Sequence, residues 1–142
     1  MKTNLQLKAL LVVAFCAMLS SFTTMPGAHS FQVYLDDKLV ADQYVRPGLI
    51  PNITVENQSR IVVKYNECNR TVSGRVLTLK DEKGNTLKEW KFEGATSGFK
   101  DPMSCSIKEI SAFRQKNVKL YYSSTDFPAG QLVATLSFSN LI

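Results

Sequence analysis

Cysteine is the first residue type in this chain that could do chemistry. Cys68 and Cys105 are separated by 37 positions, and no Cys-x-x-Cys pair occurs, so the spacing does not favour a redox centre or a zinc site. In an exported protein, a pair of cysteines is typical of a structural disulfide. We therefore predict a disulfide between Cys68 and Cys105, which would stabilise the fold by roughly 3 to 4 kcal/mol through the entropy of the unfolded chain.

The N-terminus has the three-part pattern of a secretory signal peptide. Two lysines precede an apolar run at residues 9–19, and the polar stretch after it ends in the small-residue site Ala-His-Ser at residues 28–30. We predict a signal peptide at residues 1–30 and a single domain at residues 31–142, in the periplasm or outside the cell.

Removal of the signal peptide changes which chemistries are open to the protein. The only histidine is His29, so the predicted mature chain has none. Serine and cysteine triads, two-histidine metal sites and histidine acid–base catalysis all need this side chain. The loss of Lys2 and Lys8 also lowers the formal net charge from +5 to +3.

The apolar run does not predict a membrane-spanning helix. It has eleven residues, whereas a helix needs about 20 to cross the bilayer core, and no later segment offers a span. Cys16 occupies the place of a lipoprotein's lipidated cysteine, but Phe15 is bulkier than the small residue expected before it. We therefore predict that Cys16 is not lipidated.

The charged residues predict no catalytic or nucleic-acid site. The acidic side chains lie in predicted turns or beside lysines, as at residues 80–83 and 88–93, which is typical of a solvated face rather than a carboxylate pair or a phosphate-binding track. The spacing of the acids also lacks the dense oxygen ligands of a calcium loop. We predict no catalytic residue, no metal site, no cofactor and no nucleic-acid partner.

Aromatic residues are the remaining candidates for a binding surface. Trp90, Tyr121 and Tyr122 lie on predicted strands and could contact a protein, peptide or glycan, although strand tyrosines are commonly packing residues. Three glycosylation sequons begin at Asn52, Asn57 and Asn69. Their number does not decide whether the chain comes from a bacterial envelope or a eukaryotic secretory pathway.

These side chains must be positioned mainly by β-strands. Apolar and polar residues alternate with a period of two over most of the chain. The predicted strands cover residues 31–36, 39–45, 60–66, 75–80, 86–92, 118–123 and 131–140. A long loop is expected at residues 93–102.

One short helix is predicted after Ser106. Ser106 and Glu109 fit a capping box, in which each side chain accepts a hydrogen bond from the other residue's backbone amide. Ile107, Ile110 and Phe113 recur every three residues, which is enough for two or three turns ending near residues 116–117.

About seven strands and one short helix predict a mainly β fold. We expect an immunoglobulin-like antiparallel β-sandwich, with a small β-barrel as the alternative. The tryptophan and disulfide arrangement of true immunoglobulin domains is not met, since Trp90 lies on a mid-chain strand.

The runs at residues 34–40, 87–92 and 121–124, with Pro-Ala-Gly at 128–130, resemble uncharacterised small exported β-sandwich proteins of Gram-negative bacterial envelopes. The resemblance implies export and supplies no functional residue. We expect a non-enzymatic module that binds through a sheet face, an edge strand or the 93–102 loop. The alternative is a small-ligand binder with a pocket between the sheets or under the helix.

Overall fold

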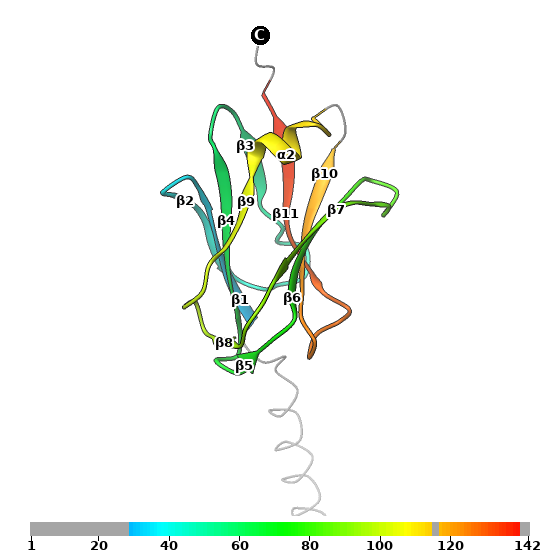
Figure 1. Ribbon diagram of the computed structural model, residues 1–142. Coiled ribbons are helices and arrows are strands. Elements are labelled where there is room, and N and C mark those ends of the chain that lie inside the picture. Colours follow the sequence, from blue (N-terminus) through cyan, green and yellow to red (C-terminus); the bar gives the residue numbers. More distant parts are fainter. Residues whose placement is uncertain (1–28, 115–116, 140–142) are drawn as a thin grey trace, which may run out of the picture.

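In the part of the chain that the structure describes, the fold is a two-sheet β-sandwich with one short helix at one end (Figure 1). The structure is a computed structural model and describes residues 29–114 and 117–139. The first 28 residues, with Cys16 and most of the predicted signal peptide, lie outside the described residues, as do residues 115–116 at the predicted helix end. The prediction of a mainly β sandwich is confirmed, and the two sheets have separate edge strands, unlike the small barrel considered as the alternative.

Both large sheets combine strands from distant parts of the chain. The four-stranded sheet has the order β2 (Lys38–Tyr44), β1 (His29–Leu35), β4 (Arg60–Glu67) and β9 (Met103–Ser106). The five-stranded sheet has the order β3 (Asn52–Val55), β11 (Gln131–Phe138), β10 (Val118–Ser123), β6 (Arg75–Lys80) and β7 (Thr86–Phe92). A small ribbon pairs β5 (Thr71–Val72) with β8 (Thr96–Ser97) at the end opposite the helix α2 (Ile107–Ser111).

The alternating pattern predicted the main hairpins. The β1–β2 and β6–β7 hairpins form where turn residues separate two alternating runs, and all neighbouring strands pair antiparallel except β3 with β11, which are parallel. Asp36 takes a positive φ of 53° in the first turn. Its carboxylate accepts hydrogen bonds from the Ser59 and Arg60 amides, which joins this turn to the start of β4.

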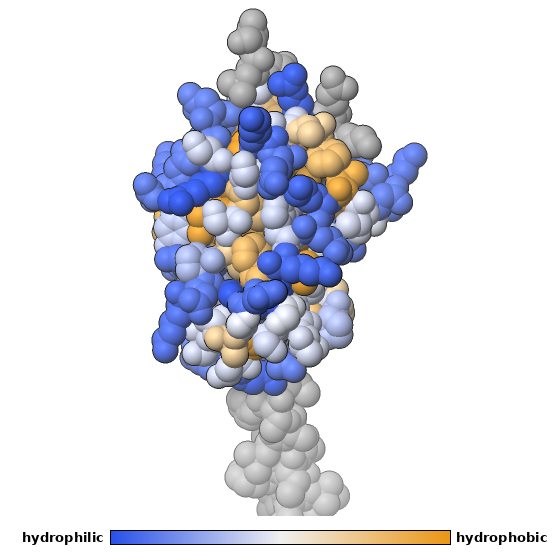
Figure 2. All heavy atoms as spheres, viewed as in Figure 1, coloured by the Kyte–Doolittle hydropathy of each residue, from blue (hydrophilic) through white to orange (hydrophobic). Residues whose placement is uncertain are grey.

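The core lies between the sheets and is made by the inward faces of the strands. β1 contributes Phe31 and Val33, and β10 contributes Val118, Leu120 and Tyr122, all of them buried. The surface in Figure 2 is mostly hydrophilic, and apolar side chains show only in small groups between polar ones. Hydrophobic burial on this scale is the main stabilising contribution to such a domain.

The helix is shorter than predicted, and the capping box is wrong. Ser106 is the extended last residue of β9, paired with Arg60, and its side chain makes no capping hydrogen bond. The Ile107 amide instead donates to the carbonyl of Ser59, the residue before β4, at 2.9 Å. Glu109 is engaged elsewhere, since its carboxylate accepts from Trp90 Nε1 at 2.9 Å and pairs with Lys88 at 3.3 Å. These two hydrogen bonds hold the pKa of Glu109 below its ordinary value.

Strand β1 begins two residues before the predicted domain boundary. His29 and Ser30 pair with Glu67 and Asn66 of β4. The His29 carbonyl accepts the Val45 amide at 2.9 Å, and its Nδ1 lies 3.0 Å from the Tyr65 hydroxyl. Both residues therefore contribute to the sheet.

The two extra residues of β1 predict that chains beginning at His29 and at Phe31 differ in stability. A chain that begins at Phe31 should unfold with a free energy about 1 to 3 kcal/mol lower than one that begins at His29, because it loses a hydrogen bond and leaves the Tyr65 hydroxyl without its partner. Urea denaturation of the two purified chains measures the difference. Coincident transitions would show that residues 29 and 30 contribute nothing to stability.

Candidate functional site

The predicted disulfide is not formed, and the geometry of β4 explains why. Cys105 lies on β9 directly opposite Ile61 of β4, whereas Cys68 follows the other end of β4. Seven residues of extended chain separate Ile61 from Cys68, which corresponds to about 23 Å. A disulfide needs Cα atoms within about 7 Å, and both cysteines are free thiols. Period-two alternation places residues on a face but does not show which end of the sandwich they occupy.

The two free thiols should differ in reactivity. Burial, with a smaller contribution from the charge of Glu109, raises the pKa of Cys105 to about 12, and the side chain is buried. Cys68 is half-buried in the loop after β4. A thiol reagent at neutral pH should label Cys68 in the folded protein and both cysteines only in denaturant.

A reducing agent should leave the melting temperature unchanged, because there is no disulfide to reduce. A lower melting temperature after reduction, or no titratable thiol in denaturant, would restore the disulfide prediction.

The three aromatic candidates lie in different environments. Tyr122 is fully buried, so it is not exposed to a partner of the folded chain. Trp90 packs half-buried against the core and donates to Glu109. Tyr121 lies half-buried on the outer face of its sheet with Lys80 Nζ 4.9 Å from its ring centroid, which is typical of a cation–π contact. Of the three, Tyr121 and Trp90 are therefore partly accessible to solvent, and Tyr122 is not.

A buried polar cluster, which we call the Glu67 cluster, lies at the end opposite α2. Glu67 is only 1% exposed, and its Oε2 accepts a 2.6 Å hydrogen bond from the Tyr122 hydroxyl. The Tyr122 ring stacks on Tyr65 at 3.9 Å between centroids, and Tyr65 reaches His29. Burial is the main cause that raises the pKa of both tyrosines. The charge of Glu67 adds to this for Tyr65, and the hydrogen bond to Glu67 adds to it for Tyr122, so both hydroxyls stay protonated.

Two buried polar atoms beside this cluster have no hydrogen-bond partner among the described residues. They are Glu67 Oε1 and Arg75 Nε, although another nitrogen of Arg75 donates to the Asp101 carbonyl at 2.7 Å. The sequence shows Glu67 as the last residue of an alternating strand and carries no signal that its side chain points inward. The cluster is structural, because its reactive atoms are enclosed.

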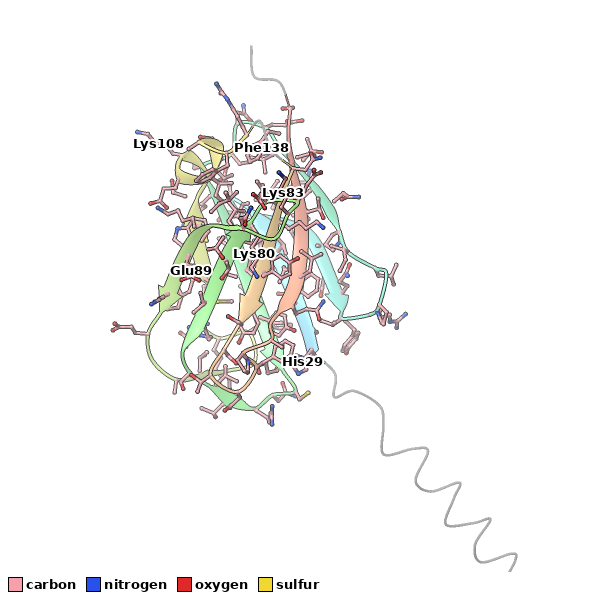
Figure 3. All side chains as sticks on the ribbon, turned by 90° about the vertical axis from the view of Figure 1, so that its right-hand side faces the viewer. His29, Lys80, Lys83, Glu89, Lys108 and Phe138 are labelled. Atoms are coloured by element: carbon pink, nitrogen blue, oxygen red, sulfur yellow. The ribbon has the colours of Figure 1, made fainter. Side chains whose placement is uncertain are left out.

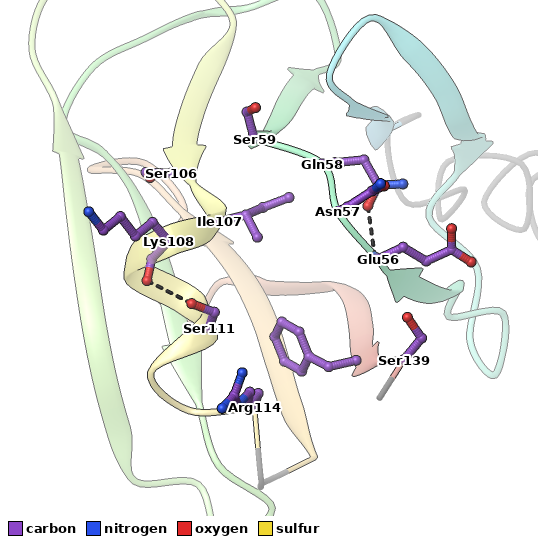
Figure 4. A pocket seen from close by; sticks show the side chains of 11 residues that line it. Glu56, Asn57, Gln58, Ser59, Ser106, Ile107, Lys108, Ser111, Arg114 and Ser139 are labelled. Carbon is purple, nitrogen blue, oxygen red and sulfur yellow. Dashed lines mark hydrogen bonds between the residues drawn. The ribbon is translucent and has the colours of Figure 1, made fainter. Parts of the chain in front are cut away.

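A concave site lies beside α2. It has a volume of about 980 Å³ and is bounded by the β3–β4 turn, the first turn of α2 and the end of β11. We call it the α2 hollow. Figure 4 shows α2 on one side and residues 56–59 on the other, with the Ile107 side chain pointing from the helix into the space between them. Phe138, at the end of β11, supplies a second apolar side chain to the lining.

Backbone hydrogen bonds hold the walls of the α2 hollow. The Ile107 amide donates to Ser59, and the Ser139 amide donates to Val55 at 3.1 Å. Gln58 Oε1 accepts from the Glu56 amide at 2.8 Å and closes the turn. Since each wall is tied to a strand of the sandwich, the hollow is a largely pre-formed surface.

The α2 hollow is polar and has an excess of positive charge. Its lining includes two basic residues, Lys108 and Arg114, and one acidic residue, Glu56. In Figure 4 the Lys108 ammonium group points away from residues 56–59. Neither cation has a carboxylate within 4.0 Å among the described residues. The rest of the polar lining consists of the hydroxyls of Ser59, Ser106, Ser111 and Ser139 and the amides of Asn57 and Gln58. Such a lining can hold a hydroxylated anion through charge-assisted and neutral hydrogen bonds.

A small-ligand binder with a cavity lined by Trp90, Phe92 and Phe113 is the alternative expected from the sequence. These three side chains pack against the core and do not line the α2 hollow. Asn57, the first residue of the second predicted sequon, does line the α2 hollow. Glu56 to Ser59 join strands that the sequence does not show to be close to the helix.

The described residues contain no group of three or more histidine, cysteine or acidic side chains placed to hold a metal ion. Within the same residues, no helix has the length and apolar character needed to cross a bilayer. Comparison of the sequence with models of protein families finds no match, and comparison with curated proteins finds none either.

Proposed function

We propose that this chain is an exported, non-enzymatic binding module whose α2 hollow holds a small hydroxylated anion, such as an acidic sugar. The N-terminal signal pattern supports export to the periplasm or the cell exterior. The observation that carries the binding role is the lining of hydroxyls and amides in a pre-formed hollow that two basic residues, Lys108 and Arg114, border.

The chemistry of the lining favours an acidic sugar over an apolar ligand. Guanidinium and ammonium groups pair with a carboxylate, and serine and amide groups exchange hydrogen bonds with sugar hydroxyls. Ile107 and Phe138 offer apolar surface for the C–H faces of a sugar ring. Glu56 adds a hydrogen-bond acceptor and limits the net charge that the hollow can neutralise.

An amide NMR titration tests this role with glucuronate and glucose, which differ by one negative charge. Glucuronate should shift the amide signals of Ile107 and Ser111 more than glucose does. Lys108→Gln and Arg114→Gln should each weaken glucuronate binding by about tenfold, which is the value of one charge-assisted hydrogen bond. Glucose binding should change little.

Arg46→Gln provides the matched control, because it removes the same charge at a residue outside the α2 hollow. It should leave glucuronate binding unchanged. Shifts that spare the α2 hollow, or equal losses for Arg46→Gln and Arg114→Gln, would contradict the proposal.

Recognition of a glycan through the outer sheet face is a second candidate. A hollow of about 200 Å³ next to Tyr121 is lined by Thr78, Glu89 and the 128–130 turn. An aromatic ring beside polar groups is a suitable sugar platform. Shifts centred on Tyr121 in the same titration would favour this surface over the α2 hollow.

A further inference from the structure

A second, apolar pocket lies at the other end of the sandwich. It has a volume of about 420 Å³ and is lined by His29 of β1, by residues 45–48 and Ile50 of the loop after β2, by Phe127 of the β10–β11 connection and by Gln131 at the start of β11. We call it the His29 pocket. Figure 3 places His29 at the end of the molecule opposite Lys108 and Phe138. It is therefore separate from the α2 hollow, and the inference below does not rest on the proposed function.

The His29 ring is a rigid wall of this pocket. Its Nδ1 lies 3.0 Å from the Tyr65 hydroxyl, and its ring meets Phe127 edge to face at 5.1 Å. Tyr65 is itself fixed by stacking on Tyr122 in the core. Because Nδ1 is engaged, Nε2 is the ring nitrogen without a hydrogen bond among the described residues.

The loop that forms the opposite wall is anchored at both ends. The Val45 amide donates to the His29 carbonyl, and the Thr135 amide donates to the Pro51 carbonyl at 3.0 Å. Between them, Gln43 Nε2 donates to the Leu49 carbonyl at 2.7 Å. Gly130, with φ of 74°, keeps the β10–β11 connection close to β10, since a Cβ there would come within 2.8 Å of the Tyr122 carbonyl oxygen.

Two exposed apolar side chains, Tyr44 and Leu49, lie in or next to the loop of this pocket, whereas Leu39 and Val40 lie toward the other end of β2. Among the described residues, the large hydrophobic side chains that are exposed are Leu39, Val40, Tyr44 and Leu49. Tyr44 is 59% exposed and Leu49 is 56% exposed, and they flank Val45 and Gly48 in the chain. Apolar surface left exposed next to an apolar pocket is typical of a ligand-binding site.

The charge of the pocket indicates which apolar ligand fits. Arg46 lines it and has no carboxylate within 4.0 Å among the described residues. Gln131 and the imidazole of His29 are the other polar groups of the lining. We propose that the His29 pocket binds a small apolar carboxylic acid, with its hydrocarbon part against Val45, Ile50 and Phe127 and its carboxylate paired with Arg46.

The test uses protein that cells have exported and processed, with octanoate and the uncharged 1-octanol as probes. The proposal requires that His29 stays in the mature chain, whereas the cleavage predicted from the sequence, after Ser30, would remove it. The intact mass of the purified protein therefore first shows which residue begins the mature chain. Octanoate should shift the amide signals of Val45, Ile50 and Phe127 in an NMR titration and should bind more tightly than octanol. Arg46→Gln should weaken octanoate about tenfold and leave octanol nearly unchanged.

Two further variants separate the site from general effects. Arg114→Gln removes the same charge at the α2 hollow and should not change octanoate affinity. Ile50→Trp fills the pocket and should abolish binding of both probes while the dispersion of the NMR spectrum shows that the protein is folded. A mature chain that starts at Phe31, octanoate shifts confined to the α2 hollow, or unchanged octanoate affinity in Arg46→Gln would overturn the proposal. Glucuronate binding is measured on the same variants, so that failure of one site is distinguished from failure of the other.

Discussion

Replacing Tyr122 with phenylalanine is expected to lower the free energy of unfolding by about 3 kcal/mol, although the substitution removes one oxygen atom. The lost hydroxyl donates a 2.6 Å hydrogen bond to Glu67. The other carboxylate oxygen already has no partner among the described residues. Since Glu67 is 1% exposed, water cannot replace the missing donor without opening the fold. Urea denaturation monitored by circular dichroism measures the loss.

The neighbouring tyrosine is the matched control for this prediction. Tyr121→Phe removes the same atom from a half-exposed side chain on the outer face and should change stability by less than about 0.5 kcal/mol. Adding Glu67→Met to Tyr122→Phe removes the unpaired carboxylate and should recover part of the lost stability. Equal midpoints for Tyr121→Phe and Tyr122→Phe would show that the Glu67 cluster is hydrated or mobile in solution.

Leu120→Ala is expected to lower the free energy of unfolding by about 2 to 5 kcal/mol, which is similar to or larger than the effect of Tyr122→Phe. β10 lies in the middle of the five-stranded sheet, and Leu120 is paired with Leu79 on one side and Ala134 on the other. The side chain is fully buried, so its removal leaves a cavity. The neighbouring side chains cannot fill it, because backbone hydrogen bonds hold β10 between β6 and β11. The unfolding midpoint should fall while the denaturant slope stays unchanged.

Leu39→Ala removes the same atoms from a side chain on the edge strand β2 that is 44% exposed. Its cost should stay below about 1 kcal/mol. If the two leucine variants were equally destabilised, the packing between the sheets would not be the main source of stability.

The positions of the long strands could be predicted closely from the sequence. The predicted limits of β6, β7 and β10 are those of the structure. β10 alternates between buried and half-buried residues, and β6 and β7 are bounded by the turn residues of their hairpin. β1 and β2 were displaced by one or two residues at their ends. A hairpin is decided by neighbouring residues, so its turn chemistry can be recognised locally.

The sequence did not predict the short strands, because they depend on distant partner strands rather than on neighbouring residues. β3 follows Pro51 and pairs with the distant β11 in parallel, and β9 pairs with β4 across about forty residues of chain. β8 lies inside the segment predicted to be a loop. Strands of two to four residues show too few alternations to be distinguished from loops, and they form because a partner strand is already in place.

Local side-chain chemistry was sufficient to predict the sandwich, its main hairpins and a short helix after Ser106. Only the folded chain placed Cys68 and Cys105 at opposite ends of β4, turned Glu67 inward, and brought residues 56–59 beside α2 and His29 beside Phe127. The physical reason is the separation along the chain over which each kind of interaction acts. Alternation and turn preferences act between residues a few positions apart, whereas a pocket or a disulfide depends on which strands become neighbours, and that depends on the packing of the whole core.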